Sequence, residues 1–331
     1  MPFVNMFLLF FDNFILINKK KCSVKQLFNF LYINVVFCIK KCYTMYISKQ
    51  KGRTDLNKLV KIAAMAGGAF LLAQGLDKRL EVTNYIVQSD KIPPSFDGYK
   101  IAQISDYHND TVPGVSDAVR DIKPDLIVST GDLADDEGDY LSALHLCERI
   151  ANIAPVYAVT GNHDLWRGDY SDFERDIKNA GVTTLHNERV ILEADGEGIS
   201  LSGIDDPFTL NSARAREAVR NNLSKIRGYD GYDILLFHRA NLFDCIKDQG
   251  FDLVLAGHMH GGQIRFPSGR GFVSPKSGWT GKHSVFFPKY SGGRYSADGS
   301  EMLVSRGLGN PMLIPRFFNR PELTVVTLKH I

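Results

Sequence analysis

From residue 99 onward, short apolar runs alternate along the chain with segments that are predicted to form helices. Several runs are apolar throughout, which is typical of strands covered on both faces of a sheet. The predicted strands are residues 99–105, 125–130, 156–160, 199–204, 233–237 and 252–256, with an alternating strand at 322–329, and the predicted helices are 140–153, 170–180, 212–226 and 240–248. This alternation predicts an α/β fold.

One long segment, residues 264–300, does not fit the alternation. It is rich in Gly, Ser, Pro and aromatic residues and shows no periodicity. Because a strand is predicted after it, we interpret this segment as a loop or lid beside a site rather than as a linker.

Charge is distributed unevenly along the chain. Residues 1–61 hold eleven Lys or Arg and two acidic residues, a net charge of +9, whereas the rest of the chain carries −7. The mildly acidic body has no basic patch of the kind that binds nucleic acid. We therefore expect no nucleic-acid partner, and we expect a monomer.

The N-terminus divides into two parts. Residues 1–44 are dominated by Phe, Asn, Ile, Lys and Tyr, the residues that untranslated AT-rich DNA would encode, so we interpret them as a non-native extension or a misassigned start before Met45. A first membrane segment is the alternative interpretation of residues 1–44.

Residues 45–80 contain a basic stretch followed by the uncharged, mostly apolar run 62–76. This order predicts a signal-anchor or transmembrane helix, with the N-terminus in the cytoplasm and the following domain outside the membrane. Cleavage near Gly75 and a buried helix of a soluble domain are the alternatives.

Polar residues of metal-binding type follow five of the predicted strands. They are Asp106 with His108, Asp132, Asn162, His238, and His258 with His260. A strand-end Asp alone is usually a cap or a turn former, and a lone His is more often a satisfied polar group than a ligand. Seven such residues in this order make separate explanations of that kind improbable. We therefore predict a metal site at the carboxyl ends of the strands, where open α/β sheets place their sites.

The ligand types indicate two adjacent divalent ions. Asp132 can bridge them, because a carboxylate has two oxygens. Asp106, His108, Asp132 and His260 would then bind one ion, and Asp132, Asn162, His238 and His258 the other. Mn, Fe and Zn all accept such ligands, and a paired site of this kind suits attack of hydroxide on phosphorus.

With these motifs the chain resembles the calcineurin-like metallophosphoesterase family, whose marks are D-x-H, GD, GNH[DE], a lone His and GHxH. The resemblance covers residues 95–331, and it implies a four-layer α/β/β/α sandwich of two mixed sheets. It also implies hydrolysis of phosphoesters by a hydroxide that bridges two metal ions. The longer GHxHGGQ motif at 257–263 is similar to that of a bacterial branch that is typically membrane-anchored or exported, as are the segments 203–207, 305–309 and 316–322.

Two positions depart from the protein phosphatases of this family. Asp136 stands where those enzymes have an arginine that grips phosphate, and Asp164 stands where they have glutamate. These differences favour a phosphodiesterase or another hydrolase of small phosphoesters. The predicted membrane anchor and the apolar residues of segment 264–300 extend the expected substrates to a lipid-linked phosphodiester or pyrophosphate. The alternatives are a phosphomonoesterase or protein phosphatase, and a catalytically silent metal-binding scaffold.

The resemblance also implies which residues assist the reaction. His163 adjoins a ligand without being one, so we expect it to stabilise the transition state or to protonate the leaving oxygen. Asp135 is the first candidate for orienting His163, and Asp164 is the second. Arg265, Arg294 and Arg306 are candidates for binding a phosphate or an anionic head group, although each alone is more typical of a surface charge.

Overall fold

The computed structural model describes residues 56–331 apart from 209–211, 227, 267, 274–285 and 313. The chain divides into two compact units, residues 1–69 and 70–331. The predicted extension 1–44 and most of the basic stretch lie outside the described residues. Helix α3 (Leu56–Gly75) contains most of the apolar run. None of the helices in the described part of the chain combines the length and the hydrophobicity needed to cross a membrane.

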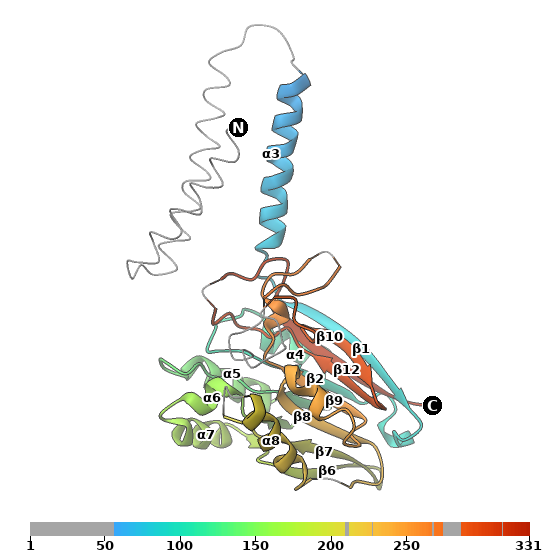
Figure 1. The fold of residues 1–331 in the computed structure, drawn as a ribbon. Helices are drawn as coiled ribbons and strands as arrows, with labels where there is room; N and C mark the ends of the chain where they lie inside the picture. Colours follow the sequence, from blue (N-terminus) through green and yellow to red (C-terminus); the bar gives the residue numbers. More distant parts are fainter. Residues whose placement is uncertain (1–55, 209–211, 227, 267, 274–285, 313) are drawn as a thin grey trace. The chain divides into compact units, whose positions relative to one another are not determined.

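Two six-stranded mixed sheets form the centre of the second unit (Figure 1). Sheet A has the order β1 (Glu81–Ser89), β12 (Glu322–His330), β2 (Lys100–Ile104), β3 (Leu126–Ser129), β4 (Val156–Ala158) and β5 (Val182–Thr184). Sheet B has the order β10 (Gly293–Ala297), β11 (Ser300–Val304), β9 (Leu253–Gly257), β8 (Asp233–Arg239), β7 (Glu197–Gly203) and β6 (Glu188–Ala194). Neighbouring strands are parallel except for the pairs β12/β2, β6/β7 and β10/β11.

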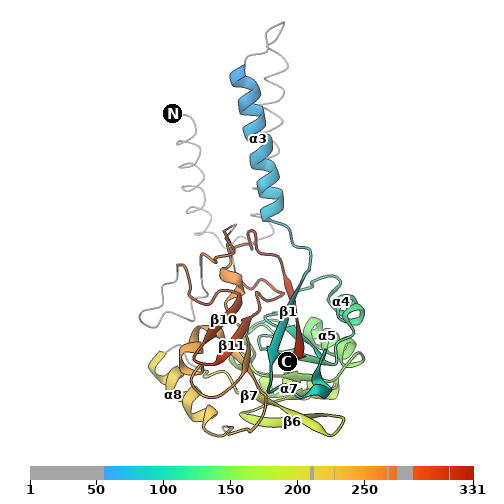
Figure 2. The ribbon, with the colours of Figure 1, turned by 90° about the vertical axis from the view of Figure 1, so that its right-hand side faces the viewer.

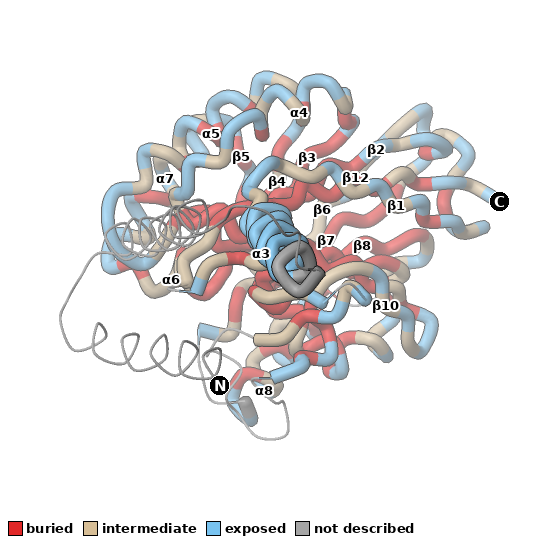
Figure 3. Tube along the Cα trace, turned by 90° about the horizontal axis from the view of Figure 1, so that it is seen from above, coloured by how far each residue is buried: buried red, intermediate tan, exposed pale blue. Residues whose placement is uncertain are grey.

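Helices cover the outer face of each sheet (Figure 2). Sheet A is covered by α4 (Val115–Ile122), α5 (Leu141–Ala151) and α7 (Tyr170–Asn179), and sheet B by α8 (Ser212–Leu223) and the 3-10 helix η2 (Ala240–Cys245). In α5, the buried residues Ala143, Leu146, Cys147 and Ile150 recur at the spacing of one helix face. That face is why the segment folds as a helix against a sheet, and the polar residues between these positions face solvent (Figure 3).

Three apolar cores separate the four layers. The inner core joins the two sheets and includes Ile101, Leu126 and Val128 of sheet A with Ile234 and Leu236 of sheet B. Alternate residues of the same strands, such as Ala102 and Ile127, belong to the core beneath the helices. Strands with apolar side chains on both faces therefore hold the layers together, and each fully buried Ile, Leu or Val contributes about 1.5–3 kcal/mol.

The predicted α/β class with two mixed sheets is confirmed, and all seven predicted strands are present with boundaries within about three residues. The helix predicted at 240–248 is present only over Ala240–Cys245, as the 3-10 helix η2. The segment 264–300 also contains β10, which the loop prediction did not include. Sequence reasoning did not find β1, β5, β6, β11, α4 or the short helix α6 (Asn162–Trp166).

The position of a strand in its sheet explains two differences from the predicted patterns, one at β12 and one at β10. The strand β12 lies between β1 and β2, so its first five residues are all buried rather than alternating. The strand β10 lies at the edge of sheet B, and its five residues are only half-buried or exposed, so they show no apolar run. The fold also uses β1, which precedes the predicted start of the domain at residue 95.

Candidate metal centre

All seven predicted ligands lie at the carboxyl ends of strands, where sheets A and B meet. Sheet A supplies four of them: Asp106 and His108 after β2, Asp132 after β3, and Asn162 at the start of α6 after β4. Sheet B supplies His238 near the end of β8, His258 after β9 and His260 in the 3-10 helix η3 (His260–Gly262). Each of these residues is buried, the most exposed being His108 at 6%.

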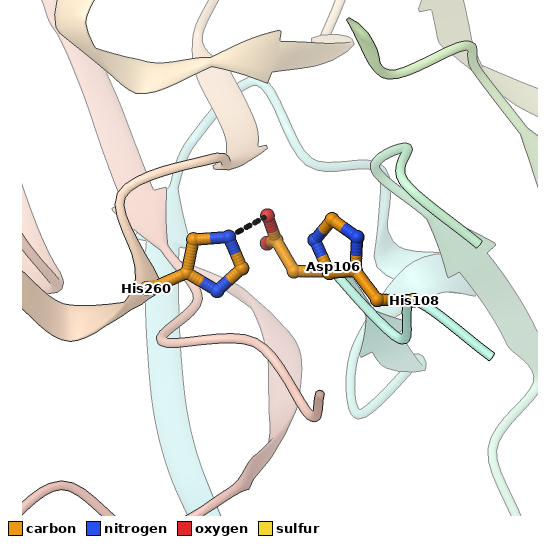
Figure 4. Close-up of side chains that lie close together, drawn as sticks. All are labelled: Asp106, His108 and His260. Atoms are coloured by element: carbon orange, nitrogen blue, oxygen red, sulfur yellow. Dashed lines mark ion pairs between the residues drawn. The ribbon is translucent and has the colours of Figure 1, made fainter. Parts of the chain in front are cut away.

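The ligands form two groups. In the first, atoms of Asp106, His108 and His260 lie within 4.8 Å of one another, and the three side chains point toward a common centre (Figure 4). His260 Nε2 is 3.5 Å from Asp106 Oδ1 in this group. In the second group, Asp132 Oδ2 is 3.1 Å from His238 Nε2, which is 3.1 Å from His258 Nδ1.

Asp132 connects the two groups. Its Oδ2 atom, which faces His238, is also 3.6 Å from His108 Nε2 in the first group. The other oxygen, Oδ1, accepts the backbone N–H of His163 at 2.8 Å, which fixes the carboxylate plane. This position between the groups is the one that a bridging ligand needs.

Buried atoms without hydrogen-bond partners show that the residues fit cations. These atoms are Nδ1 and Nε2 of His108, Oδ2 of Asp132 and Oδ1 of Asn162. Leaving such an atom unsatisfied costs about 1–3 kcal/mol. His238 Nδ1 lies 2.8 Å from the Thr130 carbonyl and donates to it, so Nε2, which is 3.1 Å from Asp132 Oδ2, is the nitrogen left to bind an ion. Imidazole and carboxylate atoms that face one another in this way are suited to metal ions.

The backbone around the ligands is strained. Asp106, His108, Asp132, His258 and His260 have φ values of 50°, 50°, 53°, 73° and 46°. Residues with a side chain rarely adopt this left-handed conformation, and it persists only where the surroundings enforce it. Backbone hydrogen bonds from Asp106 N to Gly131 O (3.0 Å) and from His108 N to Asp132 O (3.1 Å) hold two of these turns.

The electrostatics of the site favour an ionised bridging carboxylate and differ among the histidines. Burial acts to lower the pKa of His238, but the neighbouring Asp132 outweighs it and raises that pKa to about 10. Burial lowers the pKa of His258 and of His260 well below the ordinary value, so both rings are neutral. Burial alone would raise the pKa of Asp132, but the neighbouring histidines, His238 first, hold it well below the usual range. Burial raises the pKa of Asp106. Neutral imidazoles and carboxylates are the forms that bind metal.

His163 differs from the ligands because its ring is partly exposed. Its Nδ1 atom is 2.8 Å from Asp135 Oδ1 and 3.2 Å from Asp136 Oδ1. Burial acts to lower the pKa of His163, but the hydrogen bond to Asp135 and the nearby charges outweigh it and raise the pKa to about 9. The same Asp135 oxygen lies 3.4 Å from His108 Nδ1, a contact that the sequence did not predict.

Asp164, the second candidate for orienting His163, contacts backbone instead. Its carboxylate accepts N–H groups of Asp132 (2.7 Å), Ala134 (2.9 Å) and Gly161 (2.9 Å). Burial and the charge of Asp132 raise its pKa to about 6. Asp164 therefore joins the turn after β3 to the start of α6, and Asp135 is the carboxylate that meets the ring of His163.

The three candidate arginines have different surroundings. Arg306 is buried and pairs with Glu322 at 2.9 Å and with Glu81 at 3.2 Å. Arg294 pairs with Glu301 at 3.1 Å. Arg265 has no carboxylate in contact among the described residues, and its Nη1 donates to the Gly261 carbonyl at 3.1 Å. Of the three, only Arg265 lies beside the metal-ligand loop without a carboxylate in contact among the described residues.

Sequence reasoning missed a buried ion pair next to the site. Arg239, which follows the ligand His238, donates from Nε to Asp206 Oδ2 at 2.5 Å and from Nη2 to Asp206 Oδ1 at 2.8 Å. The backbone N–H of Asp206 donates to Thr160 Oγ1 at 3.0 Å, two residues before Asn162. The Asp205-Asp206-Pro207 sequence after a strand was the available signal, but it did not specify Arg239 as the partner.

Comparison with known proteins agrees with this geometry. The sequence model of the calcineurin-like phosphoesterase family matches residues 99–262. YkuE of Bacillus subtilis, an uncharacterized metallophosphoesterase, is 31% identical over 280 residues, which are 81% of this chain and 92% of YkuE. YkoQ of the same organism, also an uncharacterized metallophosphoesterase, is 30% identical over 68% of this chain and 81% of YkoQ. The phosphodiesterase YaeI of Escherichia coli is 27% identical over 70% of this chain and 82% of YaeI.

Two mixed sheets and a buried His/Asp cluster suited to two metal ions define a metal-dependent phosphoric ester hydrolase. The similarity to YkuE extends over most of both chains. The protein belongs to the calcineurin-like phosphoesterase family.

Proposed function

We propose that the protein is a phosphodiesterase or pyrophosphatase that hydrolyses a small or lipid-linked phosphoester. The observation that carries this choice is the pair of carboxylates against His163, from Asp135 at 2.8 Å and Asp136 at 3.2 Å. Two negative charges at this position disfavour the dianion of a phosphomonoester more than the monoanion of a diester. The phosphodiesterase name of the similar E. coli protein agrees with this choice.

The candidate ligands divide between two cations. Asp106, His108, Asp132 and His260 would hold one, and Asp132, Asn162, His238 and His258 the other. When bound, such a pair of ions polarises the phosphoryl oxygens and supplies a water of lowered pKa as the nucleophile. Manganese, iron and zinc all suit this set of imidazole, carboxylate and amide groups. Reconstitution of the chelated protein with each ion in turn tests which one supports turnover.

The residues around the ions supply the proton chemistry. Asp135 accepts a hydrogen bond from His163 Nδ1, so the opposite nitrogen, Nε2, is the one that can donate a proton to the leaving oxygen. The backbone of His163 is tied to Asp132 Oδ1 at 2.8 Å, which couples the position of the ring to the bridging carboxylate. Asp164 holds the turn after β3 and the start of α6 in place through its three hydrogen bonds to backbone N–H groups.

The ratio of two activities tests the proposed substrate class. The protein should hydrolyse bis-p-nitrophenyl phosphate faster than p-nitrophenyl phosphate, and Asp132→Ala or His258→Ala should abolish both activities. Asp136→Arg should shift the ratio toward the monoester, because it replaces a repelling charge with an attracting one. A wild-type preference for the monoester would favour the alternative of a phosphomonoesterase or protein phosphatase.

A catalytically silent scaffold is the second alternative. Loss of catalysis in such a protein is expected to remove ligands or His163. All eight of these residues are present, and seven of them, all but Asn162, lie in the His/Asp clusters. A metal-loaded protein that hydrolyses neither ester, nor any pyrophosphate or glycerophosphodiester in a substrate panel, would support the scaffold.

Arg265 supports a substrate that carries a second anionic group. Its guanidinium has no carboxylate in contact within the described residues, and it bonds to the carbonyl of Gly261, next to the ligand His260. Arg265→Gln should raise KM for a nucleoside diphosphate ester, which has a second phosphate, and leave KM for bis-p-nitrophenyl phosphate unchanged. Arg294→Gln is the matched control, because Arg294 is already paired with Glu301.

Membrane attachment through residues 45–80 stays a prediction. It is supported by the basic residues that precede the uncharged run 62–76. Fractionation of cells that express the chain from Met45 tests it, since an anchored protein resists extraction with alkaline carbonate and a cleaved one appears outside the cytoplasm. A protein recovered in the cytosolic fraction would contradict both forms of the prediction, and it would remove the main reason to expect a lipid-linked substrate.

A further inference from the structure

A buried arginine near the C-terminus contacts the first ligand group. Arg316 is only 7% exposed, lies beyond the residues that the family model matches, and has no carboxylate in salt-bridge contact among the described residues. Its donors face backbone and ring atoms instead. Nε and Nη2 both donate to Gly309 O, at 2.9 Å and 2.5 Å, Nη1 donates to Arg306 O at 2.8 Å, and Nη2 also lies 3.5 Å from His260 Nδ1.

The carbonyls that Arg316 binds belong to a loop that supports Asp106. In this loop, Leu308 N donates to Ser105 O at 3.0 Å and Gly309 N donates to Asp106 O at 2.7 Å. A Cβ atom on Gly307 would lie 2.6 Å from Asp106 Cβ, so the loop packs directly against that ligand. The guanidinium of Arg316 therefore contacts both the loop that packs against Asp106 and the ring of His260.

The segment around Arg316 also holds the backbone of the His260 loop. Asn319, which is fully buried, donates from Nδ2 to His260 O at 2.7 Å and to Gln263 O at 3.2 Å. Phe317 N donates to Gln263 O at 3.1 Å. Arg316 is thus part of a segment whose polar groups are directed at the His260 loop.

The guanidinium limits where the ring of His260 can lie. It is a rigid planar group held by the loop carbonyls, and its Nη2 atom contacts Nδ1 at 3.5 Å, which is too long for a good hydrogen bond, so Nδ1 can keep the proton that leaves Nε2 free to bind an ion. The opposite nitrogen, Nε2, then points at Asp106 Oδ1, 3.5 Å away. Burying a charge without an ion-pair partner is costly, which makes a purely space-filling role a poor explanation for arginine at this position.

We propose that Arg316 is a positioning residue for one of the two ions, the one held by Asp106, His108 and His260. This role of Arg316 rests on the proposed two-metal site. The contacts that define the second group, from Asp132 to His238 and from His238 to His258, do not involve the guanidinium. Loss of Arg316 should therefore remove one ion selectively, whereas a general loss of structure would remove both.

Metal binding by Arg316→Gln tests this role. The chelated full-length protein is titrated with manganese, bound metal per chain is measured, and the electron paramagnetic resonance spectrum is recorded. Wild type should bind two ions and show a spin-coupled pair. The variant should bind the first-group ion 10- to 100-fold more weakly, the usual effect of removing a residue that orients a ligand, and show the spectrum of an isolated ion.

Four further variants make the result specific. Arg320→Gln is the matched control, because Arg320 lies on the same segment and also donates to carbonyls, of Arg79 and Leu80, away from the ligands. Arg316→Lys keeps the charge but has a single ammonium in place of the fork, so it should weaken the same ion to a smaller extent. Combining Arg316→Gln with Asn162→Ala should leave no tightly bound ion, whereas combining it with His260→Ala should leave one.

The outcomes separate this role from the proposed function. Thermal unfolding of the metal-free variants checks the fold, and if Arg316→Gln does not fold, the titration of Arg316→Lys decides. Two tightly bound, coupled ions in a folded variant would overturn the role of Arg316, and so would equal weakening of both ions. If wild type itself does not bind two ions, the two-metal site fails instead. If wild type binds two ions without hydrolysing diesters, only the proposed substrate class fails.

Discussion

His163 is the residue whose surroundings differ most from those of the ligands. Its ring is partly exposed and stacks edge-on against His108 at 4.7 Å between ring centroids, while its Nδ1 faces Asp135. A ring that is oriented on one side and accessible on the other is suited to proton transfer rather than to binding an ion.

Replacing His163 with glutamine should therefore lower kcat without removing metal. General acid catalysis contributes about 10²–10⁴-fold, so we expect a loss of that size with bis-p-nitrophenyl phosphate. Metal per chain, measured on the same sample, should stay at the wild-type value. A variant that loses an ion would identify His163 as a ligand, and one that keeps full turnover would remove it from the mechanism.

Motif spacing predicted seven candidate ligands, because each follows a strand in the same chain order as the family's motifs, and the structure places six of them in two groups. It did not predict the contact of Asp135 with His108, or the roles of Arg239 and Arg316. Arg316 is 56 residues from His260, and only the pairing of elements distant in sequence brings the two together. No local pattern encodes such a contact, since any buried guanidinium looks like a surface arginine in the sequence.

Among the connecting elements, the loop between β11 and β12 packs closely against the candidate ligand Asp106. Gly307 has a φ of 74°, and a Cβ there would lie 2.6 Å from Asp106 Cβ. Gly299, in the turn between β10 and β11, has a φ of 87°, but a Cβ there would meet no atom within 4 Å. The two glycines share a backbone conformation and differ in their neighbours.

Gly307→Ala should reduce both stability and metal content, whereas Gly299→Ala should reduce stability alone. The left-handed conformation costs about 1–2 kcal/mol for a residue with a side chain, so both variants should unfold more easily by that amount. Only Gly307→Ala displaces Asp106. Chemical unfolding and metal analysis measure the two effects, and wild-type metal content in Gly307→Ala would contradict the packing argument.

His186 connects three elements away from the metal centre. It follows β5, its Nε2 is 2.7 Å from Glu174 of α7, and its Nδ1 is 2.8 Å from Asp205 after β7. Both nitrogens face carboxylates, so both must carry protons. The hydrogen bond to Asp205, which outweighs the effect of burial, raises the pKa of His186 from 6.5 to about 9.

This histidine predicts a pH-dependent part of the stability. Because the pKa is raised in the folded state, the stabilisation is fully present below about pH 6.5 and is lost as pH rises through about 9. The ring is one third exposed, so solvent reduces the size of the effect. The Tm difference between wild type and His186→Gln should be largest near pH 6 and small above pH 9. A Tm difference that does not change with pH would contradict the prediction that His186 is protonated in the folded protein.

Element prediction succeeded where strands are buried on both faces and failed where they are short or lie at edges. The strands β3 and β9 are continuous apolar runs, and the sequence identifies them directly. The strand β5 has three residues, and β6 at the edge of sheet B has no fully buried residue. Edge strands bury too little apolar surface to leave a periodic pattern, so the strand order of each sheet was not predictable.

At the scale of the whole molecule, the ligands span the seam between the two sheets, four from sheet A and three from sheet B. Bound ions should therefore stabilise the packing of one sheet against the other, in addition to each local turn. An ion that binds only the folded state adds about 2.7 kcal/mol at 100 times its Kd.

Chelation should lower the Tm of the protein, and the Tm should return when manganese, iron or zinc is added back. Calorimetry before and after treatment with EDTA, followed by dialysis, measures the change, and magnesium serves as a control for ionic strength. An identical Tm with and without bound ions would mean that the ions do not hold the sheets together.

The position of β12 has a consequence for the order of folding. This strand, residues 322–330, lies inside sheet A, and β1 pairs with no other strand of the sheet. During synthesis, β1 therefore has no partner until the ribosome has translated some 240 further residues, which the register of Glu81 with Glu322 requires. A chain stalled before residue 322 would expose the edges of both β1 and β2, and such unpaired edges are the sites at which partly made proteins aggregate.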